Sequence, residues 1–588
     1  MAVRQQIFSD LTGGINNVNT KDTLNSSNRN TETPDMINVE YLELGGIKSM
    51  NGNILVGDIQ DSAIVGGFEY RHGNIKDMVI ATYNGDVKIF NHTTREFDFI
   101  YHFNHQARRV SFCNMNGGVI ASNGIDDLIF YQKGRHTLLT GTVSLTSGSN
   151  SLTGTSTTFR TQLRVGDSVD IEGNIYFIDA IASDTSATLR TPAVATSSGV
   201  RIYLSEVSEC NAYLVNSEVQ GYRVPIRGTA IQYYKGRLWV GGEEGLFYSA
   251  PGLYNQWDEK YDAGTVGKNI YNDSSDVKGL GLFSDFLMIH KEYSSYILTI
   301  TDVGTTIKIE PYTSLSCDSQ QSWVVSNTKY YVYSQENMGI YPIGNRTIFS
   351  DRYIGDELSK KVRNIFKKLN TSSTDNIFAL NYPSKRWMIF YLPLSDGKGS
   401  NNALIYDFQT KSWLRREVPQ NVTIAFSYNN LIYIGTNDGE VLREFSGNTF
   451  NGKNIRAYYR SPWFNWFHGY TQSIGEFIME LALDYNNSFY IRSYKDGVTK
   501  YEQRNIVGDK LLGEGLVWDG DTALIYNDTT WDNDEWVNTG FRHLRMLLPN
   551  NVFEEFQIEI GTETEKDGQG FALYGYGFRR IEPDEALW

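Results

Sequence analysis

The sequence contains little cysteine, and its cysteines lie far apart. Cys113, Cys210 and Cys317 are the only three in 588 residues. An odd number without close spacing fits neither a disulfide framework nor a zinc site. Buried free thiols are the simpler interpretation, because an unpaired cysteine behaves as a small apolar residue.

Long apolar runs are also absent. The first residues, MAVRQQIFSDLTGG, lack an apolar core of signal-peptide length. No later segment approaches the about 20 apolar residues that a membrane-spanning helix needs. The sequence therefore gives no signal for a secretory route.

The chain has no excess of positive charge. Its formal net charge is −15 and its sequence pI is about 5.1. A protein that grips nucleic acid normally presents a basic face, because Lys and Arg must neutralise phosphates. The acidic balance argues against such a protein, but it is compatible with one that DNA slides past, since an acidic wall repels phosphate.

Recognisable catalytic and metal-binding motifs are missing as well. The eight histidines are scattered, and no H-E-x-x-H, C-x-x-C, G-x-S-x-G or phosphate-cradling loop occurs. The acidic run DNDEW, Asp532–Trp536, lacks the ligand spacing and glycine of an EF-hand loop. We therefore expect no enzymatic activity, no catalytic, cofactor-binding or metal-binding residues, and no cofactor.

The strongest hint of an enzyme is SYKDGVTKY, Ser493–Tyr501. It resembles the Asp-box turn of sialidases, S-x-D-x-G-x-T-W, in the order of its Ser, Asp and Thr. However, Gly497 follows Asp496 directly, and Lys500 stands where Trp is usual. In sialidases this turn is structural, and a glycosidase also needs carboxylates or a tyrosine nucleophile converging in one cleft. A glycan-binding or glycan-cleaving host-surface protein remains the alternative hypothesis.

What the chain does contain favours strands. It has 54 Gly and 38 Tyr but only 12 Pro, and aromatic runs alternate with Gly/Asn/Asp punctuation. One hairpin pattern recurs, as LIYIGTNDGEVLREF at 431–445, MVIATYNGDVKIF at 78–90 and LWVGGEEGLFY at 238–248. Units of several short strands at intervals of roughly 35 to 50 residues are typical of propeller blades. We predict a mostly β protein built on a β-propeller of six or seven blades.

One blade turn is readable in detail. In YDFQTKSW, Tyr406–Trp413, an Asp begins the turn and a Trp opens the next strand. Asp at a turn start accepts backbone N–H bonds, and Trp fills space between neighbouring sheets. Both residues are therefore interpreted as structural.

The repeated blade pattern is interrupted once, and the segments before and after it have different sequence patterns. Residues 140–204 read as a small β-barrel of about five strands inserted in a blade loop, which a surface position tolerates. Residues 455–588 alternate like an antiparallel β-sandwich. The predicted parts are 1–60, an N-terminal arm with a ring-closing strand near Gly46; 61–139, the first part of the propeller; 140–204, the inserted barrel; 205–454, the second part of the propeller; and 455–588, the sandwich.

One segment predicts a helix, GDELSKKVRNIFKKLN at 355–370. It has an apolar stripe formed by Leu358, Val362, Ile365, Phe366 and Leu369. Its lysines and arginine fall largely on the other sides. A basic helix in an acidic protein could meet DNA or an acidic neighbour, but a charge run more often forms a solvated face.

The order of these parts resembles a known family. The opening DLTGGIN and NVEYLELGGIKSMNGN, the blades, the segment GDELSKKVRNIF, and the closing SFYIRSYKDGVTKYEQ, FRHLRMLLP, FQIEI and FALYGYGFRR are similar to the tail hub, or nozzle, proteins of short-tailed bacteriophages. The insertion GTVSLTSGSNSLTGTSTTFRTQLRVGDSVDI also looks like small domains of phage tail proteins.

This resemblance implies a structural virion protein, assembled in the host cytoplasm as part of the phage tail. It would form a homohexameric ring below the portal and adaptor rings. The ring would carry tail spikes or fibres and a tail-tip plug or needle, and double-stranded DNA would pass through an acidic lumen without specific binding. The family has no short functional motif, so the resemblance transfers no catalytic or binding residue.

Overall fold

The fold is described from a computed structural model of the chain. The structure describes residues 4–18, 31–42, 45–210, 212–213, 223–224, 226–301, 306–344, 356–395, 399–467, 469–482, 488–497, 501–507, 541–547, 552–563 and 571–586. Within these residues almost all regular structure is β, as expected. Helical turns are few and short: α2 (Phe159–Gln162), η1 (Glu259–Tyr261), η2 (Lys360–Val362), α3 (Arg363–Phe366), η3 (Thr371–Asn376) and η4 (Pro383–Lys385).

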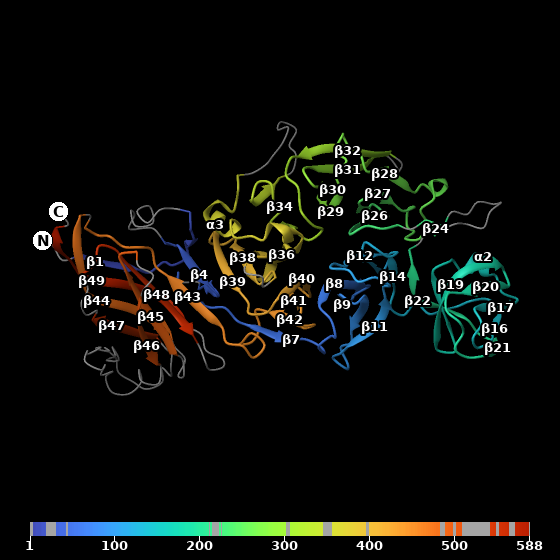
Figure 1. Cartoon of the computed structure of the whole chain (residues 1–588), viewed down its shortest axis with the longest axis horizontal. Helices are drawn as coiled ribbons and strands as arrows, with labels where there is room; N and C mark the ends of the chain where they lie inside the picture. Colours follow the sequence, from blue (N-terminus) through green and yellow to red (C-terminus); the bar gives the residue numbers. More distant parts are fainter. Residues whose placement is uncertain are drawn as a thin grey trace.

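Seven antiparallel sheets follow one another through the middle of the chain and form a β-propeller (Figure 1). Contacts between first strands join blade 1 to blades 2 and 7, blade 2 to blade 3, blade 3 to blade 4, and blade 6 to blades 5 and 7. At the remaining junction, a Cβ on Gly281 of blade 4 would lie 3.0 Å from the ring of Trp323 in blade 5, so the ring is closed. Gly67 of blade 1 shows how tight this packing is, because a Cβ there would lie 2.2 Å from the ring of Phe426 in blade 7. The prediction of six or seven blades is confirmed, with seven.

The first four blades occupy residues 64–313. Their strands, from the axis outward, are: blade 1, β8 (Ile64–His72), β9 (Ile75–Thr82), β10 (Asp86–Phe90) and β11 (Phe97–His102); blade 2, β12 (Ser111–Met115), β13 (Gly118–Ser122), β14 (Ile129–Tyr131) and β22 (Tyr203–Glu209); blade 3, β25 (Ala230–Tyr234), β26 (Arg237–Gly242), β27 (Gly245–Tyr248) and β28 (Gly264–Gly267); blade 4, β29 (Val277–Phe283), β30 (Phe286–Lys291), β31 (Ser295–Thr301) and β32 (Thr306–Thr313).

The last three blades include one that borrows a strand from the N-terminal region. Their strands are: blade 5, β33 (Trp323–Ser326), β34 (Lys329–Ser334) and β35 (Gly339–Ile343); blade 6, β36 (Phe378–Tyr382), β37 (Trp387–Leu392), β38 (Asn402–Asp407) and β39 (Ser412–Glu417); blade 7, β40 (Val422–Tyr428), β41 (Leu431–Thr436), β42 (Val441–Glu444) and β7 (Asn53–Leu55). Because β7 precedes blade 1 in sequence yet pairs with β42, it joins the two ends of the propeller.

The insertion lies between the third and fourth strands of blade 2. Its elements are β15 (Thr137–Leu138), β16 (Thr142–Leu145), β17 (Ser151–Thr155), β18 (Asp167–Ile171), β19 (Asn174–Ser183), β20 (Ser186–Leu189) and β21 (Ser197–Val200). It has an apolar core of its own, and its two ends are paired, with Thr137 opposite Leu204. The pairing order β18-β19-β20-β17-β16-β21 gives this small β domain six strands, where about five were predicted.

Two further sheets pack face to face and form a sandwich. One contains β1 (Arg4–Phe8), β5 (Val39–Tyr41), β6 (Ile47–Ser49), β44 (Tyr470–Ala482), β47 (Phe541–Leu547) and β49 (Ala572–Ala586); the other contains β4 (Asp35–Ile37), β43 (Arg456–Arg460), β45 (Ser488–Lys495), β46 (Tyr501–Val507) and β48 (Phe556–Glu563). Phe556 and Phe578, one from each sheet, meet edge to face at 5.8 Å. The two short pairs outside these sheets are β2 (Gly14–Ile15) with β3 (Glu32–Thr33) and β23 (Ala212–Tyr213) with β24 (Arg223–Val224).

Two sequence-based boundaries need correction. The strand near Gly46, β6, pairs with β5 and β49 in the sandwich, and the ring is closed by β7 instead. Four short strands of the N-terminal arm, β1, β4, β5 and β6, therefore belong to the sandwich rather than forming a separate loop-like arm. At the predicted end of the insertion, Tyr203 and Leu204 of β22 pair with β15 and β18 of the insertion, and the pairing of β22 with the blade strand β14 begins only at Val207.

The predicted helix at 355–370 is much shorter than expected. Its described part contains only η2 and α3. The apolar stripe is nevertheless turned inward, since Val362, Ile365, Phe366 and Leu369 are buried and Leu358 packs against the same core. The chain here lies beside β35, where Leu358 N donates to Ile340 O at 2.9 Å, so the outer edge of blade 5 constrains it and prevents a long regular helix.

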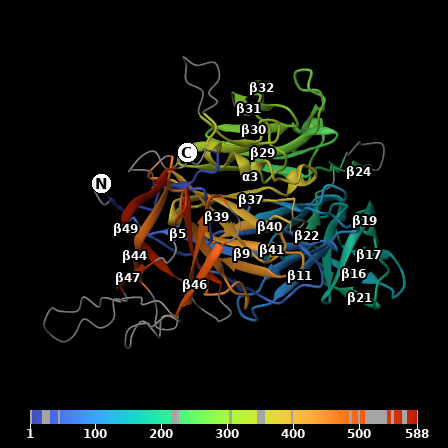
Figure 2. The ribbon, with the colours of Figure 1, turned by 60° about the vertical axis from the view of Figure 1, so that its left-hand side comes forward.

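The sandwich and the insertion lie at opposite ends of the molecule, with the propeller between them. Figure 1 shows this along the longest axis, and the turned view in Figure 2 agrees. No helix in the described part of the chain is long and apolar enough to cross a membrane.

Candidate functional site

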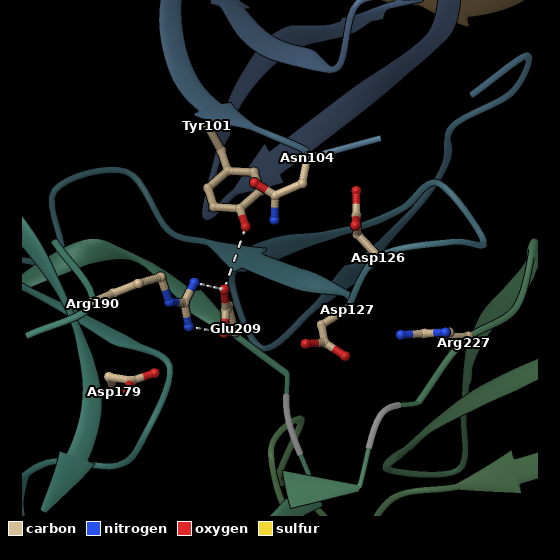
Figure 3. Close-up of a pocket in the computed structure, with 8 residues that line it drawn as sticks. All are labelled: Tyr101, Asn104, Asp126, Asp127, Asp179, Arg190, Glu209 and Arg227. Atoms are coloured by element: carbon tan, nitrogen blue, oxygen red, sulfur yellow. Dashed lines mark hydrogen bonds and ion pairs between the residues drawn. The ribbon is translucent and has the colours of Figure 1, made fainter. Parts of the chain in front are cut away.

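A cavity of about 510 Å³ lies where the insertion meets the propeller. Its lining is strongly polar, and Figure 3 shows these side chains converging from blades 1 and 2, the insertion, and the loop before blade 3. The lining residues are Tyr101, Asn104, Asp126, Asp127, Asp179, Arg190, Glu209 and Arg227.

An ion pair forms one wall of the cavity. Arg190, which follows β20 of the insertion, donates through Nη1 and Nη2 to Glu209, the last residue of β22; the Nη2–Oε2 distance is 2.8 Å. Tyr101 Oη, from β11, donates to Glu209 Oε1 at 3.4 Å. Burial and the charge of Glu209 raise the pKa of Tyr101 well above its usual value. The hydrogen bonds that Arg190 donates to Glu209 likewise raise the pKa of Arg190.

The β13–β14 turn forms a second wall. Asn123 Oδ1 accepts from Asp126 N at 2.7 Å, the local bond that sets the turn, and Asp126 accepts from His105 N at 2.9 Å and from His105 Nδ1 at 2.6 Å. Burial alone would raise the pKa of Asp126, but the bonds from His105 and Asn123 outweigh it and hold that pKa below its usual value. This carboxylate is therefore fixed in its charged form.

The cavity lacks a recognisable catalytic arrangement. The Asp126 carboxylate is held ionised by its hydrogen-bond partners, and the Glu209 carboxylate is occupied by Arg190 and Tyr101, so neither is placed as a free general acid. No group of three or more His, Cys, Asp or Glu side chains in the described ranges is placed to hold a metal ion. The geometry is that of a polar joint between two domains.

The sequence-predicted segments lie elsewhere. Ser493–Lys495 ends β45. Asp496 Oδ1 accepts from Glu554 N at 2.6 Å and Glu555 N at 3.0 Å, so the Asp-box-like turn binds the hairpin to the segment that leads directly into β48. The acidic run 532–536 lies outside the described residues. In Tyr406–Trp413, Asp407 Oδ1 accepts from Gln409 N at 2.7 Å and Trp413 is buried.

The three cysteines are free and buried. Burial raises the pKa of the Cys113 thiol to about 12, which suppresses the reactive thiolate at neutral pH. Cys210 and Cys317 are affected in the same direction by burial. The interpretation as buried free thiols is confirmed.

Sequence reasoning did not find the cavity. Its residues come from separate stretches of chain between Tyr101 and Arg227. No two of them except Asp126 and Asp127 are adjacent, so no motif marks them. The only local signal is the Asn123–Asp126 turn, whose residue types are common in any hairpin.

Comparisons with known proteins add little beyond the fold. No protein-family model matches the sequence, and no curated protein matches it. Among solved structures, the chain is similar to BamB from Moraxella catarrhalis (10% identity, 69% of this chain and 93% of that chain, TM-score 0.33). It is also similar to the WD40 β-propeller domain of Doa1 (10%, 67% and 96%, TM-score 0.32) and to YCF48 bound to D1 peptide (10%, 70% and 100%, TM-score 0.36). At these scores the similarity says nothing about function, and the propeller assignment rests on the strand pairings themselves.

Proposed function

We propose that this chain is a structural protein, the tail hub or nozzle of a short-tailed bacteriophage. The observation that carries the proposal is the layout of the molecule: a closed propeller with an auxiliary β domain at each end of the long axis (Figure 1). The order of these parts is the one in which the sequence resembles that family. Extended side surfaces of this kind suit repeated contacts between copies, and head-to-tail contacts that close give a ring.

The charge and the cavity are compatible with this role. A net charge of −15 per chain gives a ring that repels phosphate, so DNA can pass without being retained. This polar cavity is bridged by its own ion pair, which suits a joint better than a substrate site. In the proposed assembly the ring is a hexamer below the portal and adaptor, carries spikes or fibres and a plug, and is part of the virion.

The decisive experiment is a subunit count. The purified chain should be measured by native mass spectrometry alone and with the other tail proteins, and isolated tails should be imaged. Six copies at one level of the tail are expected. Any other number in the assembled tail overturns the ring model.

A binding assay tests the conduit. At physiological salt the purified chain should not retain double-stranded DNA on a filter, whereas a basic DNA-binding protein of similar size should retain it. Retention that falls steeply with added salt would contradict a passive acidic passage. Hydrolysis of a sialylated or other glycan by the chain would instead favour the glycan-directed alternative.

A further inference from the structure

Arg109 makes an unusual set of contacts. It lies in the loop between β11 of blade 1 and β12 of blade 2. Its Nη1 donates to Gln321 Oε1 at 2.9 Å, and its Nη2 donates to Asn376 Oδ1 at 2.8 Å. The guanidinium also stacks over the ring of Phe378, 4.8 Å from the centroid.

These partners lie on the far side of the propeller. Gln321 is in the loop before β33, the first strand of blade 5, and Asn376 is the last residue of η3, just before β36, the first strand of blade 6. Blades 3 and 4 separate blade 2 from blade 5 in one direction, and blades 1 and 7 separate blade 2 from blade 6 in the other. A side chain that joins blade 2 to both must therefore cross the central axis.

The three segments also share one face. Arg109 contacts both Gln321 and Asn376 directly, so the segments that carry these residues meet on one face of the ring. Arg109, Gln321 and Asn376 each precede the first strand of a blade. Their contacts therefore span the mouth of the tunnel on that face.

Placing Arg109 in these contacts costs free energy, because its charged guanidinium loses water that a surface arginine would keep. Burial lowers the pKa of Arg109 to about 10, and the charge of Asp375 only partly opposes this. Within the described ranges, no carboxylate lies within ion-pair distance of Arg109, and its partners are neutral amide oxygens. Its planar fork can engage two acceptors at once, which one lysine ammonium cannot do with the same geometry.

We propose that Arg109 is a cross-ring staple that closes the central tunnel of the propeller. It holds the segments before blades 2, 5 and 6 together and limits separation of the inner strands. The staple does not depend on the proposed function. A DNA conduit, by contrast, rests on the proposed function. If the chain forms one, DNA passes between the chains of the ring and not through the tunnel of any single propeller.

The native cysteines provide a direct test. Cys113 lies on the inner strand of blade 2, and Cys317 lies four residues before Gln321 in the loop leading to blade 5. Both are almost fully buried, at 4% and 0% exposure. Their labelling by N-ethylmaleimide, resolved peptide by peptide in a mass spectrometer, measures how often the inner strands separate.

The variants should be Arg109→Gln and Arg109→Lys in the full chain, with Arg108→Gln as the control because Arg108 is an exposed neighbour in the same loop. Arg109→Gln should label Cys113 and Cys317 at least about tenfold faster than wild type, Arg109→Lys should lie between, and Arg108→Gln should match wild type. An Arg109→Gln rate equal to that of Arg108→Gln overturns the staple.

If Arg109→Gln does not fold, a second variant that removes only one hydrogen bond tests the same proposal. In Asn376→Ala, Arg109 stays but loses one acceptor. Hydrogen exchange should then accelerate together in β12 and β36, which lie in non-adjacent blades. Acceleration confined to β36 overturns the proposal, and counting subunits of the same variants separates this result from the ring model.

Discussion

The propeller closes with one Glu–Arg pair, and the insertion is fastened to it with another. At the closure, Arg416 of β39 donates through Nε to Glu444 of β42 at 2.6 Å, and Tyr391 Oη donates to the same carboxylate at 3.1 Å. At the joint, Arg190 pairs with Glu209, and Tyr101 Oη donates to it. The chemical groups are the same, but their surroundings differ.

The closure pair is sealed from water. Both side chains are 0% exposed, and the rings of Phe445 and Phe450 lie 4.4 and 5.0 Å from the guanidinium. Arg416 also donates to Asn51 O at 2.8 Å and Gly52 O at 3.0 Å, and Asn53 Nδ2 donates to Glu444 Oε1 at 2.9 Å. The pair thereby fixes the residues that lead into β7, the strand that completes the ring.

The joint pair is open on one side. Arg190 keeps 30% of its side-chain exposure beside the cavity, whereas Glu209 keeps 2%. If one partner is lost there, water can solvate part of the charge that remains. At the closure it cannot, because an unpaired buried charge has neither counter-ion nor solvent. The difference indicates a permanent closure and a joint that the propeller does not need for its own stability.

Breaking the closure should have the largest effect. Glu444→Gln leaves Arg416 buried without a counter-charge, so we expect a loss of about 3–5 kcal/mol in unfolding free energy. Thermal and urea unfolding of the full chain measure it. Asp438→Asn, on the exposed β41–β42 turn, is the matched control and should melt like wild type.

A double variant sharpens this prediction. Replacing both partners by apolar residues, Arg416→Met with Glu444→Leu, removes the unpaired charge and should restore part of the lost stability. If Glu444→Gln melts at the same temperature as Asp438→Asn, the pair does not lock the ring.

Breaking the joint should cost less. Glu209→Gln removes the charge partner of Arg190, but the cavity admits water to that guanidinium, so we expect a loss of about 1–2 kcal/mol. Hydrogen exchange should rise in β18 to β21 and stay unchanged in β36 to β42. An equal rise in both regions would mean that the joint and the closure are one cooperative unit.

Asp318 shows what happens to a buried carboxylate that lacks an arginine. Its Oδ2 is shielded and has no hydrogen-bond partner in the described structure. Burial, assisted by the charges of Asp375 and Glu292, raises the pKa of Asp318 from 3.8 to about 6, although Thr374 and Lys278 oppose this shift. The folded state therefore binds this proton more tightly than the unfolded state, and ionisation of Asp318 weakens the fold as pH rises from about 4 to about 6.

Asp318→Asn should accordingly raise the free energy of unfolding at pH 7 by about 1 kcal/mol. This is less than the pKa shift alone would give, because the side chain is partly exposed and solvent screens its charge. At pH 4 the variant and wild type should differ far less, since Asp318 is then still protonated in the folded state. Melting temperatures across pH 4 to 7 measure the difference. A gap that is largest at pH 4 would contradict the assigned direction.

The sequence predicted what is local and missed what is distant. The hairpin turns and the Asp407–Trp413 packing follow from residues within a few positions of one another, so the blades could be anticipated. The closing strand could not, because β7 has only three residues and its bond from Asn53 to Glu444 joins positions 391 apart. The joint depends on Arg190 and Glu209 meeting across a domain boundary, which no periodicity encodes.

Removing the insertion should have the smallest effect on the propeller. The deletion must leave β22 intact. Residues 140–201 are therefore replaced by a short Gly-Ser bridge between Leu139 and Ile202. The ends are close enough for this, because the adjacent residues Leu138 and Tyr203 are paired strand neighbours. The insertion has an apolar core of its own. Deleting it removes Arg190, and Glu209 is then exposed to solvent instead of being left unpaired in a sealed interior. We expect the propeller to melt within a few degrees of wild type. Under the proposed function, assembly into tails should be impaired, because one end of the molecule is missing. If the variant fails to fold, the segment is part of blade 2 and the difference between joint and closure disappears; if it folds and assembles normally, the insertion makes no contact that the tail requires.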